Sequence, residues 1–244
     1  MESKLEVNRI FLLSPAHCGG TRARQVLSPN ARFPLAEQLR TKEGAPLGDV
    51  FAFVSGLYFR GKLAYARRFA AVPDSGNPVV GEGIQVITTT AGLRGADTRV
   101  TSSALRAFAT GDVHPENTRY RRPLEQSARA LLREIESECD VVLLGSVASP
   151  KYVDVLLAIF GDRLRFPLDF VGRGDMSRGG LLLRKAAEGC ELEYASVAGA
   201  VLHGPRPPKL PPLKRRESQG SAEEAEHTEK FTAERAKNAE ASNR

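Results

Sequence analysis

The stretch "DVVLLGSVASPKYVDVLLAIFG" (140–161) contains a complete strand–loop–helix unit. Its first six residues, 140–145, form a short apolar run that ends in glycine, which is typical of a strand buried on both faces. The remainder has helical spacing, with Ser149 as a candidate N-cap, Pro150 in the first turn and Gly161 as a stop signal. The stretch therefore predicts a strand that passes through a short loop into a helix.

The same alternation of strands and helices recurs along the chain. Further strands are predicted at "RIFLL" (9–13), "IQVITTT" (84–90) and "LEYASVAGAVL" (192–202), and further helices at 57–70, 123–137 and 177–189. Strands that alternate with helices of this length indicate an α/β fold, in which helices flank both faces of a mostly parallel sheet.

The sequence predicts the apolar face of one helix and the start of another. In 57–70 the apolar face comprises Leu57, Leu63, Tyr65, Ala66 and Phe69, and the cations expected to point elsewhere are Arg60, Lys62, Arg67 and Arg68. In 123–137 we expect Pro123 to occupy the first turn, where its missing N–H costs no hydrogen bond.

Composition divides the chain after residue 203. Residues 1–203 are expected to form one α/β domain, whereas 204–244 has five prolines in its first nine residues and only a few large apolar side chains. Such a segment buries too little surface to offset its ordering entropy, so a flexible tail is predicted. A PxxP motif within it suggests a protein partner for the tail.

Charge and cysteine content narrow the class of protein. The 244 residues include 35 Lys and Arg against 29 Asp and Glu, a formal net charge of +6. This charge suits an acidic partner such as a nucleotide or nucleic acid, and equally a basic surface without such a partner. Cys18, Cys139 and Cys190 lie far apart without a CxxC or CxxH pair, so we expect no metal and no cofactor. The first apolar run is too short for a signal or a membrane span, which predicts a cytoplasmic protein without membrane association.

Four polar loops are expected at one edge of the sheet. They are 14–22, 89–98 and 145–152, each after a strand, and 172–180, before a helix. In open parallel sheets ligands bind beyond the carboxyl ends of the strands, where helix N-termini favour anions. All four loops are rich in Gly, Ser, Thr and basic residues, so together they predict a polar ligand site.

In the first loop the sequence favours ligand binding by the backbone at the two glycines over a reaction of the Cys18 thiol. Gly19 and Gly20 allow close approach of a ligand, Thr21 is a candidate cap of the next helix, and Arg22 supplies charge. The loop matches neither the P-loop nor the Rossmann pattern. Cys18 as a nucleophile is weighed against a packed, unreactive thiol, and the second reading is favoured.

Two later loops supply candidate anion-binding and catalytic groups. Ser146 and Ser149 carry hydroxyls and Lys151 a charge, against the alternative that Ser149 only caps its helix. In 172–180 Asp175 is a candidate to orient an arginine or to accept a hydrogen bond from a ribose hydroxyl. The candidate cations of that loop are Arg173 and Arg178, and the alternative is a capped helix start.

The segment "SGLYFRGKLAYARRF" (55–69) interleaves four cations with Tyr58, Phe59, Tyr65 and Phe69. This composition is found on nucleic-acid surfaces, through phosphate contacts and base stacking. At helical spacing the aromatic side chains more often belong to the core, and that alternative is favoured here.

Three stretches in this order, "GLYFRGKLAYAR" (56–67), "VITTTAGLRGADT" (86–98) and "VVLLGSVASPKYVDVLL" (141–157), resemble the bacterial YaaA-like proteins and related small domains. The chain departs from that pattern at Thr88–Thr90, where the family tends to have Leu-Ser-Ala, and at Gly95, where proline is commoner. The resemblance implies a one-domain α/β protein and an association with DNA under stress, with no known reaction. It implies a ligand site formed by Tyr58, Arg60, Gly92 and Tyr152.

Three functions follow from these features. The first is a domain that binds a nucleotide or a nucleic-acid element through the loops. The second is an enzyme acting on a nucleoside, nucleotide or nucleobase, in which Asp175 or Asp154 acts as base or orients water and Ser146 and Arg173 share the pocket. The third is an interaction protein that recruits a partner through its tail.

Overall fold

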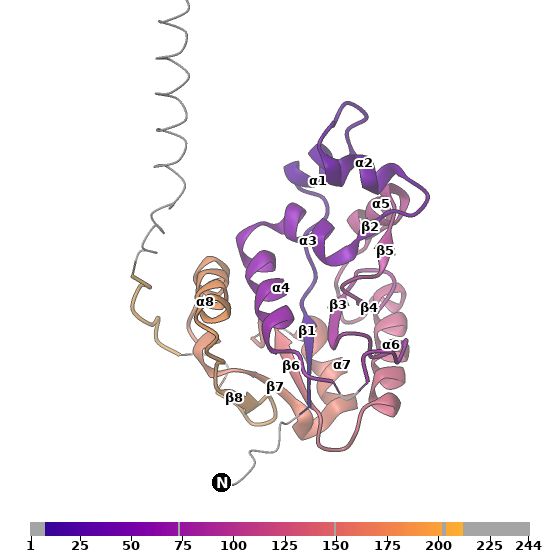
Figure 1. Ribbon diagram of the computed structural model, residues 1–244. Helices are drawn as coiled ribbons and strands as arrows, with labels where there is room; N and C mark the ends of the chain where they lie inside the picture. The colour runs from indigo at the N-terminus through magenta and orange to yellow at the C-terminus, as the bar shows by residue number, and fades with distance from the viewer. Residues whose placement is uncertain (1–7, 73, 149, 202–203, 212–244) are drawn as a thin grey trace, which may run out of the picture. The chain divides into compact units, whose positions relative to one another are not determined.

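The computed structural model describes residues 8–72, 74–148, 150–201 and 204–211 (Figure 1). The chain divides into two compact units, Met1–Leu210 and Pro211–Arg244, and every helix and strand reported below belongs to the first. Ser149 and most of the predicted tail, 212–244, lie outside the described residues.

The main sheet is mixed, with a parallel centre. Its strands are β1 (Arg9–Leu13), β3 (Ile84–Ile87), β4 (Leu93–Gly95), β6 (Asp140–Leu144), β7 (Leu164–Pro167) and β8 (Tyr194–Ser196). They lie in the order β4-β3-β1-β6-β7-β8, in which the four inner strands are parallel and the two edge strands antiparallel. A separate ribbon pairs β2 (Ala45–Pro46) with β5 (Arg99–Val100). The predicted α/β fold with a mostly parallel sheet is confirmed.

Helices occupy most of the connections. They are α1 (Thr21–Leu27), α2 (Pro34–Arg40), α3 (Leu47–Ser55), α4 (Leu57–Phe69), α5 (Ser102–Thr110), α6 (Thr118–Glu134), α7 (Pro150–Phe160) and α8 (Asp175–Glu188), with short 3₁₀ turns η1 (Gly161–Arg163) and η2 (Leu168–Phe170). None of the helices within the described ranges offers an apolar stretch of membrane-spanning length.

The predicted element bounds need three corrections. Helix α6 starts at Thr118, because the Asn117 side chain accepts a hydrogen bond from the Arg119 N–H and caps it there, so Pro123 lies inside the helix and not in its first turn. Helix α8 starts at Asp175, two residues earlier than expected. The predicted strands 84–90 and 192–202 shorten to β3 and β8.

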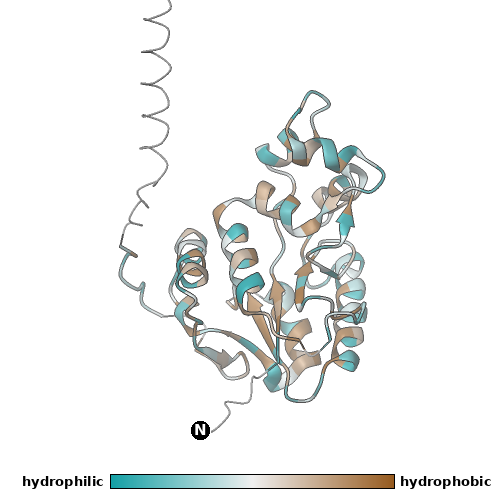
Figure 2. Cartoon of the chain, in the orientation of Figure 1, coloured by the Kyte–Doolittle hydropathy of each residue, from teal (hydrophilic) through white to brown (hydrophobic). Residues whose placement is uncertain are grey.

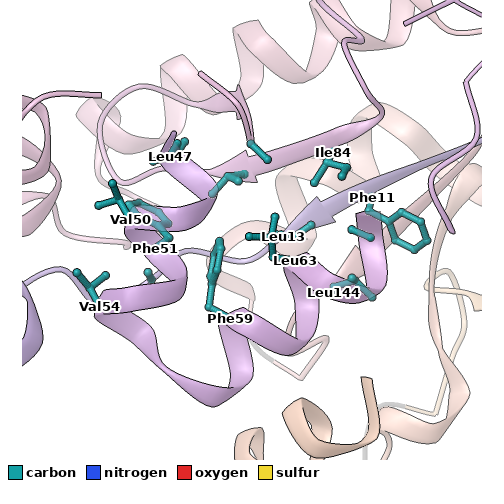
Figure 3. Close-up of a cluster of buried hydrophobic side chains, with 14 of the residues drawn as sticks. Phe11, Leu13, Leu47, Val50, Phe51, Val54, Phe59, Leu63, Ile84 and Leu144 are labelled. Atoms are coloured by element: carbon teal, nitrogen blue, oxygen red, sulfur yellow. The ribbon is translucent and has the colours of Figure 1, made fainter. Parts of the chain in front are cut away.

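Each inner strand buries both faces, and the side chains alternate between two cores. Phe11 and Leu13 of β1 belong to one cluster with α3, α4 and α8, whereas Ile10 and Leu12 belong to another with α6 and α7. Figure 2 shows the hydrophobic colouring concentrated on these central strands. Figure 3 shows part of the first cluster, where Phe59 and Leu63 of α4 lie near Leu13. The result is a sheet covered by helices on both faces.

Two glycines allow α4 and α8 to pack with their backbones in contact. A Cβ atom built on Gly61 would lie 2.5 Å from the Gly179 carbonyl oxygen, and one built on Gly179 would lie 2.7 Å from the Tyr58 Cα. No side chain fits between the helices at this crossing. The first turn of α8 is thereby held beside Tyr58.

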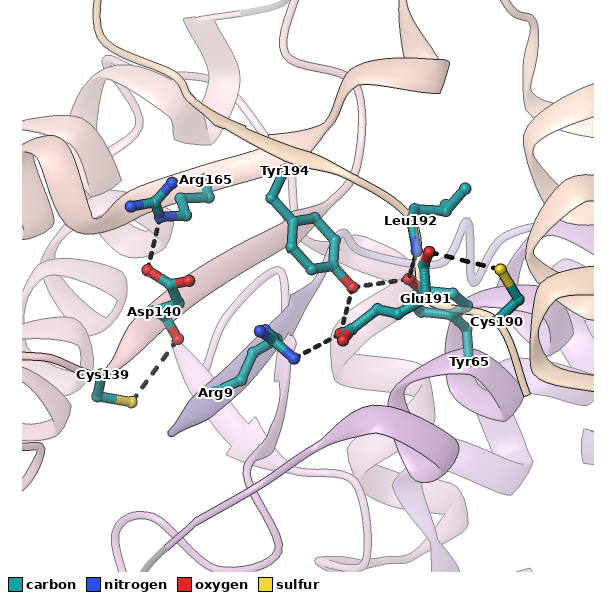
Figure 4. Close-up of polar contacts among 9 residues, drawn as sticks. All are labelled: Arg9, Tyr65, Cys139, Asp140, Arg165, Cys190, Glu191, Leu192 and Tyr194. Carbon is teal, nitrogen blue, oxygen red and sulfur yellow. Dashed lines mark hydrogen bonds and ion pairs between the residues drawn. The ribbon is translucent and has the colours of Figure 1, made fainter. Parts of the chain in front are cut away.

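A polar network joins α4 to the sheet at the other end of the helix (Figure 4). The Tyr65 hydroxyl of α4 lies 2.7 Å from the Tyr194 hydroxyl and accepts a hydrogen bond from the Leu192 N–H. Tyr194 donates to Glu191, which also pairs with Arg9 at the start of β1 at 2.6 Å. Helix α4 is thus fixed to the segment between α8 and β8.

Substitution of the two neighbouring glycines of α8 tests the crossing. We expect Gly179→Ala to lower the free energy of unfolding by about 1–3 kcal/mol, because its methyl group has no room against α4. Gly180→Ala is the matched control, since its Cβ would lie 3.6 Å from a Leu210 methyl, an ordinary contact, and we expect it to be neutral or stabilising by up to about 1 kcal/mol. Urea denaturation of both variants measures their free energies of unfolding. Equal changes in the two variants would contradict a close backbone contact at Gly179.

Candidate functional site

The four predicted loops meet in one cleft of about 560 Å³. It opens at the carboxyl ends of β1, β3 and β6, where the rule for parallel sheets places ligands. The lining residues are 14–18, Tyr58, Thr89, 108–113, Ser146, Lys151, Tyr152 and Asp175. Each of the four loops contributes at least one of them.

The structure brings together five of the candidate site residues and leaves the others outside the cleft. Those that line it are Tyr58, Ser146, Lys151, Tyr152 and Asp175. Those elsewhere are Gly19, Gly20, Thr21, Arg22, Arg60, Gly92, Arg173 and Arg178, and the alternative base Asp154 borders a different hollow on α6 and α7. Ser149 lies outside the described residues.

The glycine turn of the first loop leads away from the cleft. Helix α1 has Gly20 as its N-cap, so Thr21 is the first helical residue and not the cap. Its hydroxyl instead accepts a hydrogen bond from Arg24 at 3.1 Å. Arg22 is exposed and lies against Gly56. The part of this loop that lines the cleft is 14–18, before the glycines.

Gly92 and the two arginines of the fourth loop have structural contacts. Gly92 adopts φ +69°, where a side chain is strained, and packs against the Pro123 carbonyl of α6. Arg173 donates to the Asp169 carbonyl at 2.9 Å, and Arg178 donates to the Phe170 carbonyl at 3.1 Å. Both side chains are only 11% exposed, so these arginines hold the turn before α8 and do not line the cleft.

Asp175, in contrast, lines the cleft with an exposed carboxylate that can contact a ligand. It is the first residue of α8, its side chain is 67% exposed, and its carboxylate lies 3.4 Å from Arg178. A carboxylate there interacts favourably with the helix dipole.

Lys62 is buried beneath the cleft, which corrects the expectation that it points away from the apolar face. Its amine donates to the Ser14 carbonyl at 2.8 Å and to the Ser14 hydroxyl at 2.9 Å. The Nζ atom also lies 4.6 Å from the ring centre of Tyr58 and 4.7 Å from that of Phe59. The side chain is 1% exposed. Position 62 is one helical turn after Tyr58 and less than one before Tyr65, a spacing that marks the buried face.

Burial makes this amine titrate near neutrality. Removal from water lowers the pKa of Lys62 to about 7, against an opposing effect of the Asp175 charge. Within the described residues Lys62 forms no ion pair that would restore its ordinary value. At physiological pH a substantial fraction of the Lys62 side chains therefore carries a neutral amine.

Ser14 also lies close to Tyr152. The Tyr152 hydroxyl accepts a hydrogen bond from the Ser146 N–H at 2.9 Å. Burial raises the pKa of Tyr152, and hydrogen bonds with Ser146 and Ser14 partly oppose that rise. Gly145 makes room for this contact, because a Cβ there would lie 2.8 Å from both the Ser14 Cβ and the Tyr152 hydroxyl. The polar floor of the cleft thus runs from Lys62 through Ser14 to Tyr152.

One wall of the cleft was missed in the sequence because α5 was not predicted. The Thr89 hydroxyl donates to the Phe108 carbonyl at 2.8 Å, and Gly111 packs against Thr89 too closely for any side chain. These contacts hold 108–113 at the mouth of the cleft. A signal for α5 is present in the sequence, since Leu105 and Phe108 are its buried residues at helical spacing.

The thiol of Cys18 and the aromatic residues of α4 follow the structural readings that the sequence favoured. Burial raises the pKa of Cys18 to about 12, and its thiol donates to the Ala16 carbonyl, so no thiolate forms near neutral pH. Phe59 and Tyr65 are buried in the core, and hence offer no exposed ring on which a base could stack. Across the described ranges, no three His, Cys, Asp or Glu side chains gather as a metal site would require.

Comparison of the chain with protein-family models, with curated proteins and with solved structures gave no match. The YaaA-like resemblance therefore stays a prediction. Of the four residues it implies, Tyr58 and Tyr152 line the cleft, whereas Arg60 and Gly92 do not.

The pH dependence of stability tests the burial of Lys62. Its pKa is about 7 in the folded protein and near 10.5 ordinarily, so between these values the unfolded chain binds more protons and stability rises with pH. Lys62→Met removes this titration. We expect the unfolding free energy of the unmodified protein to increase relative to this variant by a few kcal/mol from pH 7 to 10, since one pKa unit corresponds to about 1.4 kcal/mol.

Urea denaturation at several pH values measures this difference. Lys42→Met is the control, because it makes the same substitution at an exposed lysine. A flat difference for Lys62→Met would show that its amine is not buried as described.

Proposed function

We propose that the chain binds a nucleotide in this cleft. The observation that carries the proposal is the convergence of loops from three parallel strands on a single cavity of about 560 Å³, a size typical of small-ligand sites. Tyr58 contributes aromatic surface for a base, and Lys151 lies in the first turn of α7, where the helix dipole also favours a phosphate.

A sugar has partners in the same cleft. Asp175 is exposed at the start of α8 and accepts hydrogen bonds from hydroxyls, and Ser146 supplies a further hydroxyl. A free nucleotide is favoured over a nucleic-acid strand because Phe59 and Tyr65 of α4 are buried in the core, and of the aromatic residues of this helix Tyr58 lines the cleft. A protein partner for 204–244 stays a prediction, since most of that segment lies outside the described residues.

Calorimetric titration with nucleoside monophosphates and with the matching nucleosides tests the proposal. We expect Lys151→Ala to weaken nucleotide binding about tenfold, equivalent to about 1.4 kcal/mol, because one charge-assisted contact to the phosphate is lost. Nucleoside affinity should change less than twofold. Lys42→Ala, which removes an exposed lysine outside the cleft, should alter neither affinity.

Absence of binding for all the mononucleotides at millimolar concentration would refute nucleotide binding. Single-stranded oligonucleotide provides the comparison, since binding to a strand weakens steeply with salt. Tight, strongly salt-dependent binding of the oligonucleotide alone would favour the nucleic-acid alternative.

A further inference from the structure

The contact between Ser14 and Lys62 has a chemical consequence beyond ligand binding. Ser14 lines the cleft, and the Lys62 amine lies 2.9 Å from its hydroxyl oxygen on the side away from solvent. Lys62 itself is not among the lining residues and is 1% exposed, so it reaches a ligand only through Ser14. When Lys62 is neutral, its lone pair can accept a hydrogen bond from the Ser14 hydroxyl, to which the ammonium form donates one. A serine that lines a cleft, with a buried amine within hydrogen-bond distance, is the arrangement of an activated nucleophile and its base.

The charges around the amine permit it to act as a base. Asp175 on α8 is the acidic group whose charge acts on Lys62, and it is mostly exposed. Tyr58 and Tyr152 are held neutral by burial, and Arg178 on α8 adds a positive charge that acts on both tyrosines. The amine titrates near pH 7, which is close to the best value for a general base at neutral pH.

We propose that Ser14 is a nucleophile, with Lys62 as its general base, that cleaves a carboxylic ester bound in the cleft. The Ser14 oxygen forms a bond to the ester carbonyl carbon while its proton passes to the Lys62 amine. The carbonyl electron pair moves to the carbonyl oxygen and then returns as the bond to the leaving alkoxide breaks. The alkoxide takes the proton from the Lys62 ammonium.

Water completes the cycle. It gives a proton to Lys62 and attacks the acylated Ser14, and the carboxylic acid is released as the serine oxygen recovers its proton. The developing negative charge on the carbonyl oxygen needs hydrogen-bond donors. The backbone N–H groups of Ala16, His17 and Cys18 belong to the same lining loop and donate to no other group among the described residues.

A fluorophosphonate probe tests Ser14 without knowledge of the natural ester. In the labelling step the Ser14 oxygen bonds to phosphorus, fluoride leaves, and the proton passes to Lys62. We expect a single adduct by intact mass, located at Ser14 by peptide mapping and absent in Ser14→Ala. Ser103→Ala, which removes an exposed serine outside the cleft, should label as the unmodified protein does.

The role of Lys62 has its own readout. Lys62→Met should slow labelling by at least about 100-fold, the usual contribution of a general base. In the unmodified protein the labelling rate should rise with pH, with its midpoint near pH 7, and level off above that as the base becomes fully neutral. Should the variant fail to fold, this pH profile decides alone, since a serine without a base would follow hydroxide without levelling.

Three results would overturn the proposal: no adduct at Ser14, equal labelling of Lys62→Met, or a rate that does not level off. The inference shares its cleft with the proposed nucleotide but does not require one. Labelling of Ser14 that a bound nucleotide blocks supports both. Labelling that no nucleotide blocks, together with absence of nucleotide binding, supports the serine nucleophile and refutes nucleotide binding.

Discussion

The close approach of α4 and α8 at Gly61 and Gly179 determines the geometry around the cleft. Because the two backbones touch there, the first turn of α8 lies beside Tyr58, and Lys62 of α4 is enclosed between the helices and the end of β1. An amine enclosed in this way needs oxygen partners, and the carbonyl and hydroxyl of Ser14 provide two. The same packing therefore buries Lys62 and holds Ser14 at the cleft.

The sequence predicted the layers of the fold well and its peripheral elements poorly. The runs at 9–13 and 140–145 are apolar throughout, because β1 and β6 are buried on both faces, and such runs are easily recognised. The antiparallel edge strands β4 and β8 have three residues each, too few for a periodic pattern. Pro123 suggested a helix start, although the true N-cap, Asn117, is further upstream.

The candidate site, too, could be predicted only in part. Four loops could be predicted to meet because parallel strands place their carboxyl ends at one edge, and all four contribute to the cleft. Which side chain of each loop faces inward could not be predicted, because that depends on where each helix begins. Thr21 is not the expected cap because Gly20, one residue earlier, is the N-cap of α1. Arg173 does not line the cleft because it donates a hydrogen bond to the Asp169 carbonyl. Lys62 was missed because its charge was given more weight than its spacing.

The position of β1 in the sheet also governs how the chain is made. This strand is first in sequence but central in space, and its hydrogen bonds go to β3 on one side and β6 on the other. At ribosomal rates of about 5–20 residues per second, roughly 7–26 s separate the synthesis of Leu13 from that of Leu144. During that interval the backbone N–H and C=O groups on the β6 side of β1 have no native partner, so the nascent strand presents an unpaired edge beside exposed apolar side chains.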